Sequence, residues 1–435
     1  MTGPVASSAR SVCGRSATES DGLPRDVRLA EPGVSKVIRN HHEKWWRPDR
    51  LSYAWTSSAL GLSALNRAYS PGVLVPMIRP LSPTSSPAVT VWVHTPSAIP
   101  SRLPALRAFT TSDRPSALSR DPAWLSVLRD GLRHQVYALE AVADGRTCGY
   151  LPLAYVSSIL FGRFLVSLPY LNSNGVLAAS PDVQTLLVSR AVALADELGV
   201  RHLELRHEAP VDHPALGGRM TAKVNMRLRL PDSADGLWKG FDPKVRNQVR
   251  KGEKAGLGVW WGGDELLNEF YAVVSHNMRD LGTPVYGREL FETILSTFPG
   301  RAEICVVRAA EQPVAAALLL HGEGVSEVPT ASSLREFNHT CCNMLMYRHL
   351  LDRAVARGQA VFDFGRSTRD GNTFKFKRQW GAEPHPAVWQ YYLRDGTLGE
   401  MRPDNPRYQK MIRVWQRLPL PVTRYLGPHI VRGIP

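Results

Sequence analysis

Cysteine is scarce in this chain of 435 residues, which contains only five. They are Cys13, Cys148, Cys305, Cys341 and Cys342. None forms a CxxC pair, and no Cys or His neighbour has the spacing of a metal site, so we expect no bound metal. An odd number of cysteines without a disulfide framework is typical of proteins of the reducing cytosol. The adjacent Cys341–Cys342 pair allows a redox-active interpretation, but small residues at a helix start are the simpler one.

A long uninterrupted hydrophobic run is also missing. The longest apolar stretch, residues 151–171, is broken by Gly162 and Arg163. It therefore predicts two buried strands and a turn rather than a membrane span. Residues 1–30 are polar and mixed in charge, without the apolar region of a signal peptide. These features predict a cytoplasmic protein.

Several widespread catalytic motifs are absent. The sequence contains no GxxxxGK[ST], GxSxG or HExxH pattern, which excludes the P-loop, nucleophile-elbow and zincin types of site. A DFG triplet at Asp363 is shared with protein kinases. No HRD-type loop or early glycine-rich loop accompanies it, so we exclude a kinase.

Positive charge, in contrast, is in excess: 53 Lys and Arg face 39 Asp and Glu, a net charge of +14. This balance is consistent with an anionic partner, such as a phosphate-bearing donor, a nucleic acid or an acidic membrane surface, but basic enzymes without such a partner are equally common. No helix-turn-helix or RNA-binding signature is present, so we expect no sequence-specific DNA binding. The hydrophobic fraction of 43% is sufficient for real cores.

The pattern along the chain predicts four parts. Residues 1–87 are expected to be a poorly ordered extension that ends in a Pro/Ser-rich linker. Residues 88–224 and 225–395 show a similar order of strands and helices, which predicts a tandem duplication. We expect an α/β (α+β) fold in which each unit has a mixed twisted sheet flanked by helices. Residues 396–435 are expected to be a basic tail, with seven Lys/Arg against two Asp/Glu.

A basic helix is predicted to begin after Asp242, which has the position of its N-terminal cap, followed by a proline in the first turn. Basic residues repeat every four positions and form one stripe. Like charges at this spacing destabilise an isolated helix by about 0.2–0.5 kcal/mol per pair, and a bound polyphosphate would relieve this repulsion. A solvated helix face is the alternative. The stripe consists of Arg246, Arg250 and Lys254.

The segment 363–381 combines a strand end with a basic, aromatic run. A predicted buried strand delivers Asp363 and Arg366 to its C-terminal end, where sites of α/β proteins usually lie. Downstream, a short helix is predicted at residues 372–379, in which Phe376 precedes Lys377 and aromatic and basic residues alternate. A lysine held by aromatic neighbours can stabilise a developing oxyanion. Core aromatics with snorkelling lysines would give the same spacing, which therefore does not decide between site and core.

Three further residues are predicted to line the site. Tyr286 follows a Gly-Thr-Pro turn, and Asn343 and Tyr347 lie at the start of a helix expected to continue to Arg357. His276, upstream of the turn, is a candidate general base, although a lone histidine beside a loop is more often structural.

Together these motifs resemble the FemAB family, whose members carry tandem GNAT-type (N-acyltransferase) domains. The resemblance covers residues 88–435, about four-fifths of the chain. It is carried by KVRNQVRKGEKAGL, NMRDLGTPVYGRELFETIL, FDFGRST and FKFKRQWGAEP. The C-terminal sequence NPRYQKMIRVWQRLPLPVTRYLGPHIVRG is similar to the subgroup that accompanies PEP-CTERM/exosortase and exopolysaccharide gene clusters.

The family resemblance implies a reaction. In the family, an aminoacyl group passes from aminoacyl-tRNA to the amine of a peptidoglycan precursor. The family's Phe-Lys pair falls on Phe376 and Lys377, which implies that Lys377 stabilises the tetrahedral oxyanion. The acceptor would attack the donor carbonyl directly, with proximity supplying much of the rate. No permanently bound cofactor is implied: the acyl donor, aminoacyl-tRNA or acyl-CoA, is a co-substrate whose phosphates face the basic stripe.

Two departures from the family pattern leave the donor open. The stretch before Asn343 lacks the glycines of the pyrophosphate loop of acyl-CoA enzymes, and residues 264–298 predict two short helices rather than a long tRNA-embracing hairpin. We expect transfer to an amine or hydroxyl of a cell-envelope or exopolysaccharide precursor, at the inner face of the membrane. The alternative is a catalytically silent GNAT-like module that recruits polysaccharide enzymes to the membrane through the basic tail.

Overall fold

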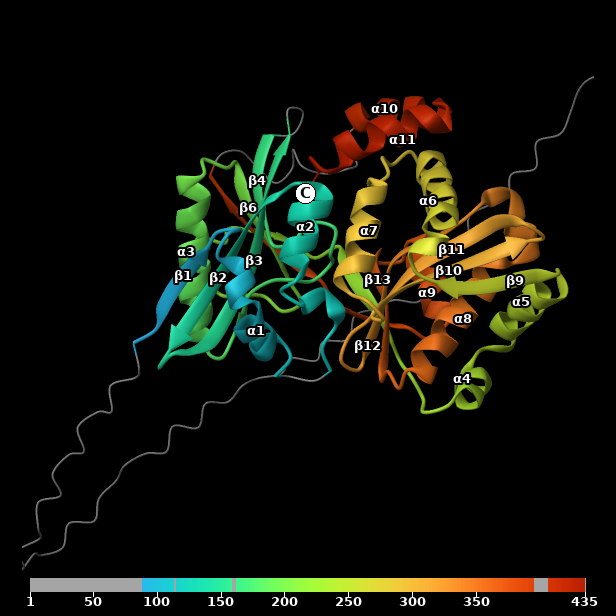
Figure 1. Ribbon diagram of the computed structural model, residues 1–435, viewed down its shortest axis with the longest axis horizontal. Coiled ribbons are helices and arrows are strands. Elements are labelled where there is room, and N and C mark those ends of the chain that lie inside the picture. The colour runs from blue at the N-terminus through green and yellow to red at the C-terminus, as the bar shows by residue number, and fades with distance from the viewer. Residues whose placement is uncertain (1–87, 113–114, 159–161, 395–405, 435) are drawn as a thin grey trace, which may run out of the picture. The chain divides into compact units, whose positions relative to one another are not determined.

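Two twisted sheets flanked by helices make up the fold (Figure 1). The structure, a computed structural model, describes residues 88–112, 115–158, 162–394 and 406–434. The extension predicted at residues 1–87 lies outside these ranges. Within them, every helix is too short or too polar to cross a membrane.

The first sheet has the strand order β1-β2-β3-β4-β6-β15-β7, with β5 added on β3. Its strands are β1 Thr90–His94, β2 Gln135–Ala143, β3 Arg146–Ser158, β4 Gly162–Val166, β5 Leu177–Ala178, β6 His202–His207, β7 Gly218–Met220 and β15 Val388–Leu393. The helices of this half are α1 Ile99–Thr110, η1 Leu118–Arg120, α2 Trp124–Leu132 and α3 Pro181–Glu197. Only β4 and β6 pair in parallel, and α3 provides the crossover that parallel strands require.

The second sheet has the order β14-β8-β13-β12-β11-β10-β9. Its strands are β8 Lys223–Arg229, β9 Leu257–Gly262, β10 Ala302–Ala309, β11 Gln312–His321, β12 Val325–Ser333, β13 Val361–Thr368 and β14 Glu383–Pro386. Its helices are α4 Ala234–Gly240, α5 Pro243–Lys254, η2 Asp264–Leu266, α6 Leu267–Leu281, α7 Arg288–Thr297, η3 Arg335–Thr340, α8 Cys342–Ala356 and α9 Asn372–Gln379. Again one pair, β12 with β13, is parallel, and α8 connects it.

The same order of elements occurs twice. The first half runs β1, α1, α2, β2, β3, β4, α3, β6, and the second runs β9, α6, α7, β10, β11, β12, α8, β13. In both, three antiparallel strands lead into one crossover helix and a parallel strand. The predicted fold class, two mixed sheets flanked by helices, is confirmed.

Each sheet contains two strands from outside its own repeat, β7 and β15 in the first sheet and β8 and β14 in the second. β15 follows the second repeat in sequence but pairs antiparallel with β6 of the first sheet. β8 precedes the second repeat and pairs antiparallel with β13. The sequence placed residues 387–393 in the second unit, because an apolar strand pattern does not reveal which sheet edge it joins. The predicted unit boundaries themselves stay predictions.

A hydrophobic core lies between the two halves, where α2 packs against α7. Gly131 permits this approach, since a Cβ atom there would lie only 3.0 Å from the Cα of Leu290. Trp124, Leu128 and Phe291 are almost completely buried in the same core. Burying each such side chain contributes roughly 1.5–3 kcal/mol. The halves are therefore joined by core packing.

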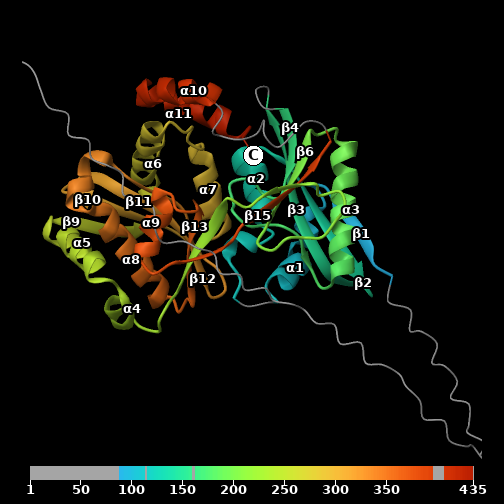
Figure 2. The same cartoon turned by 180° about the vertical axis from the view of Figure 1, so that it is seen from behind.

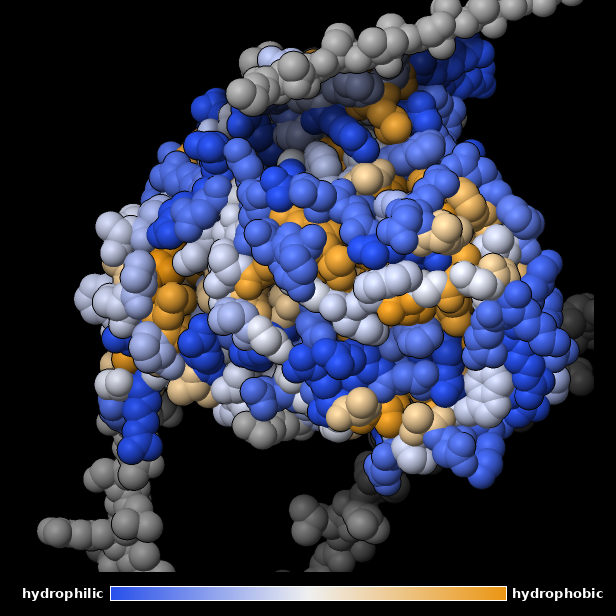
Figure 3. Space-filling model, turned by 45° about the vertical axis from the view of Figure 1, so that its right-hand side comes forward, coloured by the Kyte–Doolittle hydropathy of each residue, from blue (hydrophilic) through white to orange (hydrophobic). Residues whose placement is uncertain are grey.

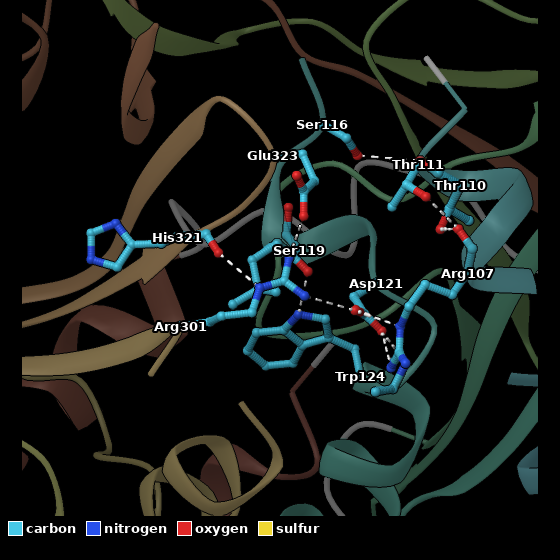
Figure 4. Close-up of polar contacts among 12 residues, drawn as sticks. Arg107, Thr110, Thr111, Ser116, Ser119, Asp121, Trp124, Arg301, His321 and Glu323 are labelled. Carbon is cyan, nitrogen blue, oxygen red and sulfur yellow. Dashed lines mark hydrogen bonds and ion pairs between the residues drawn. The ribbon is translucent and has the colours of Figure 1, made fainter. Parts of the chain in front are cut away.

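Hydrogen bonds and an ion pair between the two halves add to this packing (Figure 4). Asp121 accepts two hydrogen bonds from Arg107, of 3.0 and 3.1 Å, and forms an ion pair of 3.5 Å with Arg301 of the second half. The amide of Ser116 donates to the carbonyl of Glu323 at 2.8 Å. These contacts hold η1 of the first half against the strand β12 of the second.

The C-terminal segment, interpreted from sequence as a tail, contains two helices. These are α10 Pro406–Arg417 and α11 Leu420–Val431, which lie over α6 (Figures 1 and 2). The side-chain amide of Gln416 donates to the carbonyl of Asp280 at 3.0 Å, and the Nε of Arg424 donates to the hydroxyl of Ser275 at 2.8 Å. The segment is therefore attached to the second half.

Candidate active site

The candidate site begins where two parallel strands separate. β12 and β13 pair at three positions, the last with Glu327 opposite Asp363. Beyond it, β12 continues along β11 and β13 along β8, so the two strands diverge. Tyr170 of the first half reaches this gap, where its hydroxyl lies 3.0 Å from that of Thr330 on β12. Both halves therefore contribute to the site.

A cavity of about 720 Å³ lies at this gap. Its volume is within the range typical of sites for small molecules or parts of larger ones. Residues from η1, the segment 170–173, β8, β12 and β13 line it, and most of its central groups are polar. They include Ser119, Arg120, Asn172, Glu208, Arg227, Glu327, Asp363 and Gly365.

Arg227 forms ion pairs with two carboxylates of the cavity. Its Nε donates to Asp363 at 2.8 Å, and its two terminal nitrogens contact the carboxylate of Glu208, one at 3.0 Å. The second oxygen of Asp363 accepts a hydrogen bond of 2.7 Å from the amide of Gly365. Both oxygens of Asp363 are thus engaged, so the geometry suits a positioning role for this predicted site residue.

Glu327 is the carboxylate with the most unusual environment. One oxygen accepts a hydrogen bond of 2.8 Å from the amide of Ser119, and the other accepts one of 2.7 Å from its hydroxyl. Burial, and then the negative charge of neighbouring Asp363, raise the pKa of Glu327 to about 7. A carboxylate with such a pKa can accept and release a proton near neutrality.

Glu327 is not among the site residues predicted from the sequence. In the sequence it is a lone carboxylate within the residues of β12. Its partner Ser119 lies 208 positions upstream. Only the folded chain brings these two residues together.

Lys377 lies on α9, a short helix whose predicted bounds, Asn372–Gln379, the structure reproduces. The side chain is only 8% exposed, and its Nζ donates to the carbonyls of Gly365 at 3.0 Å and Arg366 at 3.1 Å. Burial lowers its pKa to about 8, against an opposing effect of Asp363. An ammonium group has three donors. The two carbonyls use two of these donors, and Lys377 itself is not among the residues that line the cavity.

Gly365 lies close to Asn172, Lys377 and the carbonyl of Val328. It adopts a φ of +77°, and a Cβ there would lie 3.3 Å from the Nδ2 of Asn172 and 3.9 Å from the Nζ of Lys377. The carbonyl oxygen of Val328 would also be 3.9 Å away. The backbone of Gly365 thus stands among groups from both halves and from both diverging strands.

Alanine at this position is expected to destabilise the protein more than alanine at a matched glycine. Gly358 has a φ of +67° and no atom near its would-be Cβ, so Gly358→Ala isolates the backbone strain, about 1–2 kcal/mol. Gly365→Ala adds crowding against Asn172 and should cost about 1–3 kcal/mol more. Urea denaturation of both variants measures the difference. Equal losses in the free energy of unfolding would show that a methyl group at Gly365 does not crowd Asn172.

Arg366 and Tyr286, two predicted site residues, lie beside the cavity rather than on its wall. The guanidinium of Arg366 stacks on the ring of Trp389 at 3.7 Å, and burial lowers its pKa to about 10. The ring of Tyr286 meets that of Tyr170 edge-on, with centroids 5.2 Å apart. Trp389 belongs to β15, so Arg366 contacts a strand of the first sheet. The roles predicted for Arg366 and Tyr286 stay predictions.

Tyr347 and Phe376 pack together behind Lys377. Tyr347 is 7% exposed, stacks on Phe364 with ring centroids 5.6 Å apart, and meets Phe376 at 5.0 Å. These rings hold α9 against α8 and so position Lys377. Asn343 lies half-buried in the first turn of α8, outside the cavity wall.

The basic stripe lies on α5, as expected. Asp242 caps the helix by accepting a hydrogen bond of 2.7 Å from the amide of Lys244. The helix packs against α8, where Gly252 permits close contact: a Cβ there would be 3.0 Å from that of Leu345. The stripe faces outward, with Arg250 and Lys254 exposed and Arg246 half-buried.

His276 does not take part in the cavity. Its Nε2 lies 3.7 Å from a carboxylate oxygen of Asp280, four residues later on α6. This contact favours the structural interpretation of His276 over the general-base one.

The equivalent position in the first sheet is filled. After the parallel pairing of β4 with β6, the backbone amide of Arg206 donates to the hydroxyl of Ser167 at 2.8 Å. Its guanidinium donates to the carbonyl of Leu171 at 2.6 Å. Side chains of the protein itself thus occupy the place where the second sheet has its cavity, so the second sheet is the candidate for chemistry.

A match to a known protein family supports the second sheet as the site of chemistry. Residues 241–378 match the family model Acetyltransf_6, described as an acetyltransferase (GNAT) domain. This part of the chain is a GNAT-type domain. It contains Glu327, Asp363 and Lys377, together with the helices α5, α8 and α9. No curated protein matches the sequence.

Solved structures match this chain at low sequence identity. FemX is 16% identical, with a TM-score of 0.52 over 71% of this chain and 97% of that one. A tandem GNAT protein from the clavulanic acid biosynthesis pathway is 13% identical, with a TM-score of 0.47 over 71% and 100% of the two chains. L-PGS from Bacillus licheniformis is 15% identical, with a TM-score of 0.45 over 74% and 96%. At such identity the likeness to FemX concerns the fold alone.

Proposed function

We propose that this protein is an acyl- or aminoacyltransferase that modifies an amine or hydroxyl of a cell-envelope or exopolysaccharide precursor. The observation that carries the proposal is the buried ammonium of Lys377, which two backbone carbonyls hold at the point where β12 and β13 separate. One of its N–H groups stays available for an oxyanion. The match of this segment to a GNAT domain supports acyl transfer in particular.

In the proposed reaction, the acceptor nitrogen or oxygen forms a bond to the acyl carbon of the donor. The electron pair of the carbonyl bond moves to its oxygen, and Lys377 stabilises the resulting negative charge. Glu327 takes the proton that the acceptor loses. Collapse of the intermediate breaks the bond to the leaving group, which receives the proton from Glu327. The acyl group never becomes attached to the protein.

The donor is proposed to carry phosphate, as aminoacyl-tRNA and acyl-CoA both do. The exposed Arg250 and Lys254 and the half-buried Arg246 support this, because a phosphate ligand would offset the repulsion along α5. The helix lies against α8, the crossover helix of the same domain.

The acceptor is proposed from the FemAB resemblance and its PEP-CTERM-associated subgroup. In that family the acceptor is the amine of a peptidoglycan precursor. The cavity of about 720 Å³ supports an acceptor that inserts a small part carrying the reactive group. Four carboxylates line this space and favour an amine, those of Glu208, Glu327, Asp363 and Glu383.

Mass spectrometry of envelope polysaccharides and lipid-linked precursors tests the function. A strain lacking this protein should lose one acyl or aminoacyl mass from a precursor, and the wild-type gene should restore it. Identical precursor masses in both strains would overturn the proposal. A silent binding module would give that result and would bind neither aminoacyl-tRNA nor acyl-CoA.

A further inference from the structure

Exposed hydrophobic side chains are concentrated on the two C-terminal helices. On the face shown in Figure 3, hydrophobic residues occur in separate groups among hydrophilic ones. Of the nine large hydrophobic side chains that are exposed in the described residues, five lie on α10 and α11. A sixth, Leu281, ends α6 directly beneath them. This concentration marks an interaction surface.

On α10 the inner and outer faces are distinct. Ile412 contacts Gly282 at the C-terminal end of α6, so this face is attached to the protein. The opposite face presents Met411 and Val414, which are 56% and 61% exposed. Lys410 and Arg413, both exposed, flank them. A helix with an attached apolar residue on one side has no structural need for exposed apolar residues on the other.

On α11 the same division recurs with helical spacing. Thr423, Gly427 and Val431, four residues apart, are buried against the protein. The exposed side includes Tyr425, which is 72% exposed, and Leu426, which is 38% exposed. Both helices therefore present an apolar stripe to the outside.

Charge identifies the occupant of this surface. Residues 406–434 contain six Lys and Arg and no Asp or Glu. Two copies of the chain meeting here would place like charges together, which disfavours a symmetric dimer. Apolar side chains among basic ones are typical of helices that lie in the interface of an anionic bilayer.

We propose that α10 and α11 form a docking surface for an anionic lipid bilayer, with Met411, Val414 and Tyr425 entering the headgroup region. Basic side chains beside them contact lipid phosphates. The proposal goes beyond acyl transfer and does not depend on it. A protein held at the membrane in this way acts on substrates presented at the bilayer surface.

Flotation of the full-length protein with vesicles tests the proposal. Wild-type protein should float with vesicles of phosphatidylglycerol and phosphatidylcholine, and not with phosphatidylcholine alone. Raising the salt concentration should weaken binding, because the Debye length shortens. The variant Met411→Ser/Val414→Ser/Tyr425→Ser should bind at least about tenfold more weakly. No binding of the wild type to anionic vesicles would overturn the proposal.

A second variant keeps the test independent of helix packing. Lys410→Glu/Arg413→Glu changes two exposed side chains and should weaken binding about 25-fold, roughly fivefold for each basic residue. Circular dichroism should show that it remains folded. Binding equal to that of the wild type would contradict the proposal.

Matched controls distinguish this surface from general stickiness and charge. Trp92→Ser/Leu186→Ser removes two exposed hydrophobic residues of the first half, and Arg146→Glu/Arg219→Glu reverses two exposed charges there. Both should bind within about twofold of wild type. Equal losses in the controls would overturn the assignment to α10 and α11. A wild-type dimer that the triple variant dissociates, without vesicle binding, would identify a protein interface instead.

Discussion

Replacing Lys377 by methionine is expected to lower the rate constant of acyl transfer about 10²–10³-fold, the usual effect of removing one oxyanion donor. Methionine has a similar length and can fill the space of the buried stem. It removes the charge and the N–H that would face the oxyanion. A transfer assay with the acceptor identified by mass spectrometry measures the effect.

Lys375→Met is the matched control for this variant. Lys375 lies on the same helix, two residues earlier, and is exposed. It should retain nearly wild-type transfer, because its side chain points away from the carbonyls that hold Lys377. Wild-type turnover by Lys377→Met, or an equal loss in Lys375→Met, would remove Lys377 from the proposed mechanism.

Replacing Glu327 by glutamine is expected to lower the transfer rate about 10²–10⁴-fold, the range for loss of a general base. The wild-type rate should rise with pH through about 7, as Glu327 loses its proton and becomes able to accept one. It should fall again above about 8, as Lys377 loses the positive charge that stabilises the oxyanion. The profile is therefore expected to be bell-shaped and narrow.

In Glu327→Gln the acidic limb of this profile should disappear, while the alkaline limb near pH 8 remains. Glu383→Gln provides the control, because Glu383 lines the same cavity but is exposed and does not contact Ser119. This control should keep both limbs. An acidic limb that persists in Glu327→Gln would assign the proton transfer to another group.

Local features of the sequence were sufficient to predict several elements of the site. A cap and a proline placed the start of α5, and a pattern of apolar residues ending at Gly358 placed α8 to within a residue at each end. The helix α9 agrees with its predicted bounds. These signals act within a few residues of one another, so they can be read without the fold. Repetition of the same element order also gave the fold class.

The composition of the cavity could not be predicted in this way. Its wall combines Ser119 and Glu208 of the first half with Arg227, Glu327 and Asp363 of the second. Polar residues within buried strands give no sequence signal of their partners, which are set by the packing of α2 on α7. The same holds for β15, because the choice of a sheet edge depends on contacts far away in sequence.

The strand β15 is synthesised long after β6, the strand of the first sheet with which it pairs. About 180 residues separate the end of β6 from the start of the strand that pairs with it. At ribosomal speeds, about 10–40 s pass before this partner is synthesised. During this time the edge of β6, with Glu204 and Arg206, has no neighbouring strand, and an unpaired edge invites aggregation. The first sheet therefore has all its strands only after β15 has been synthesised.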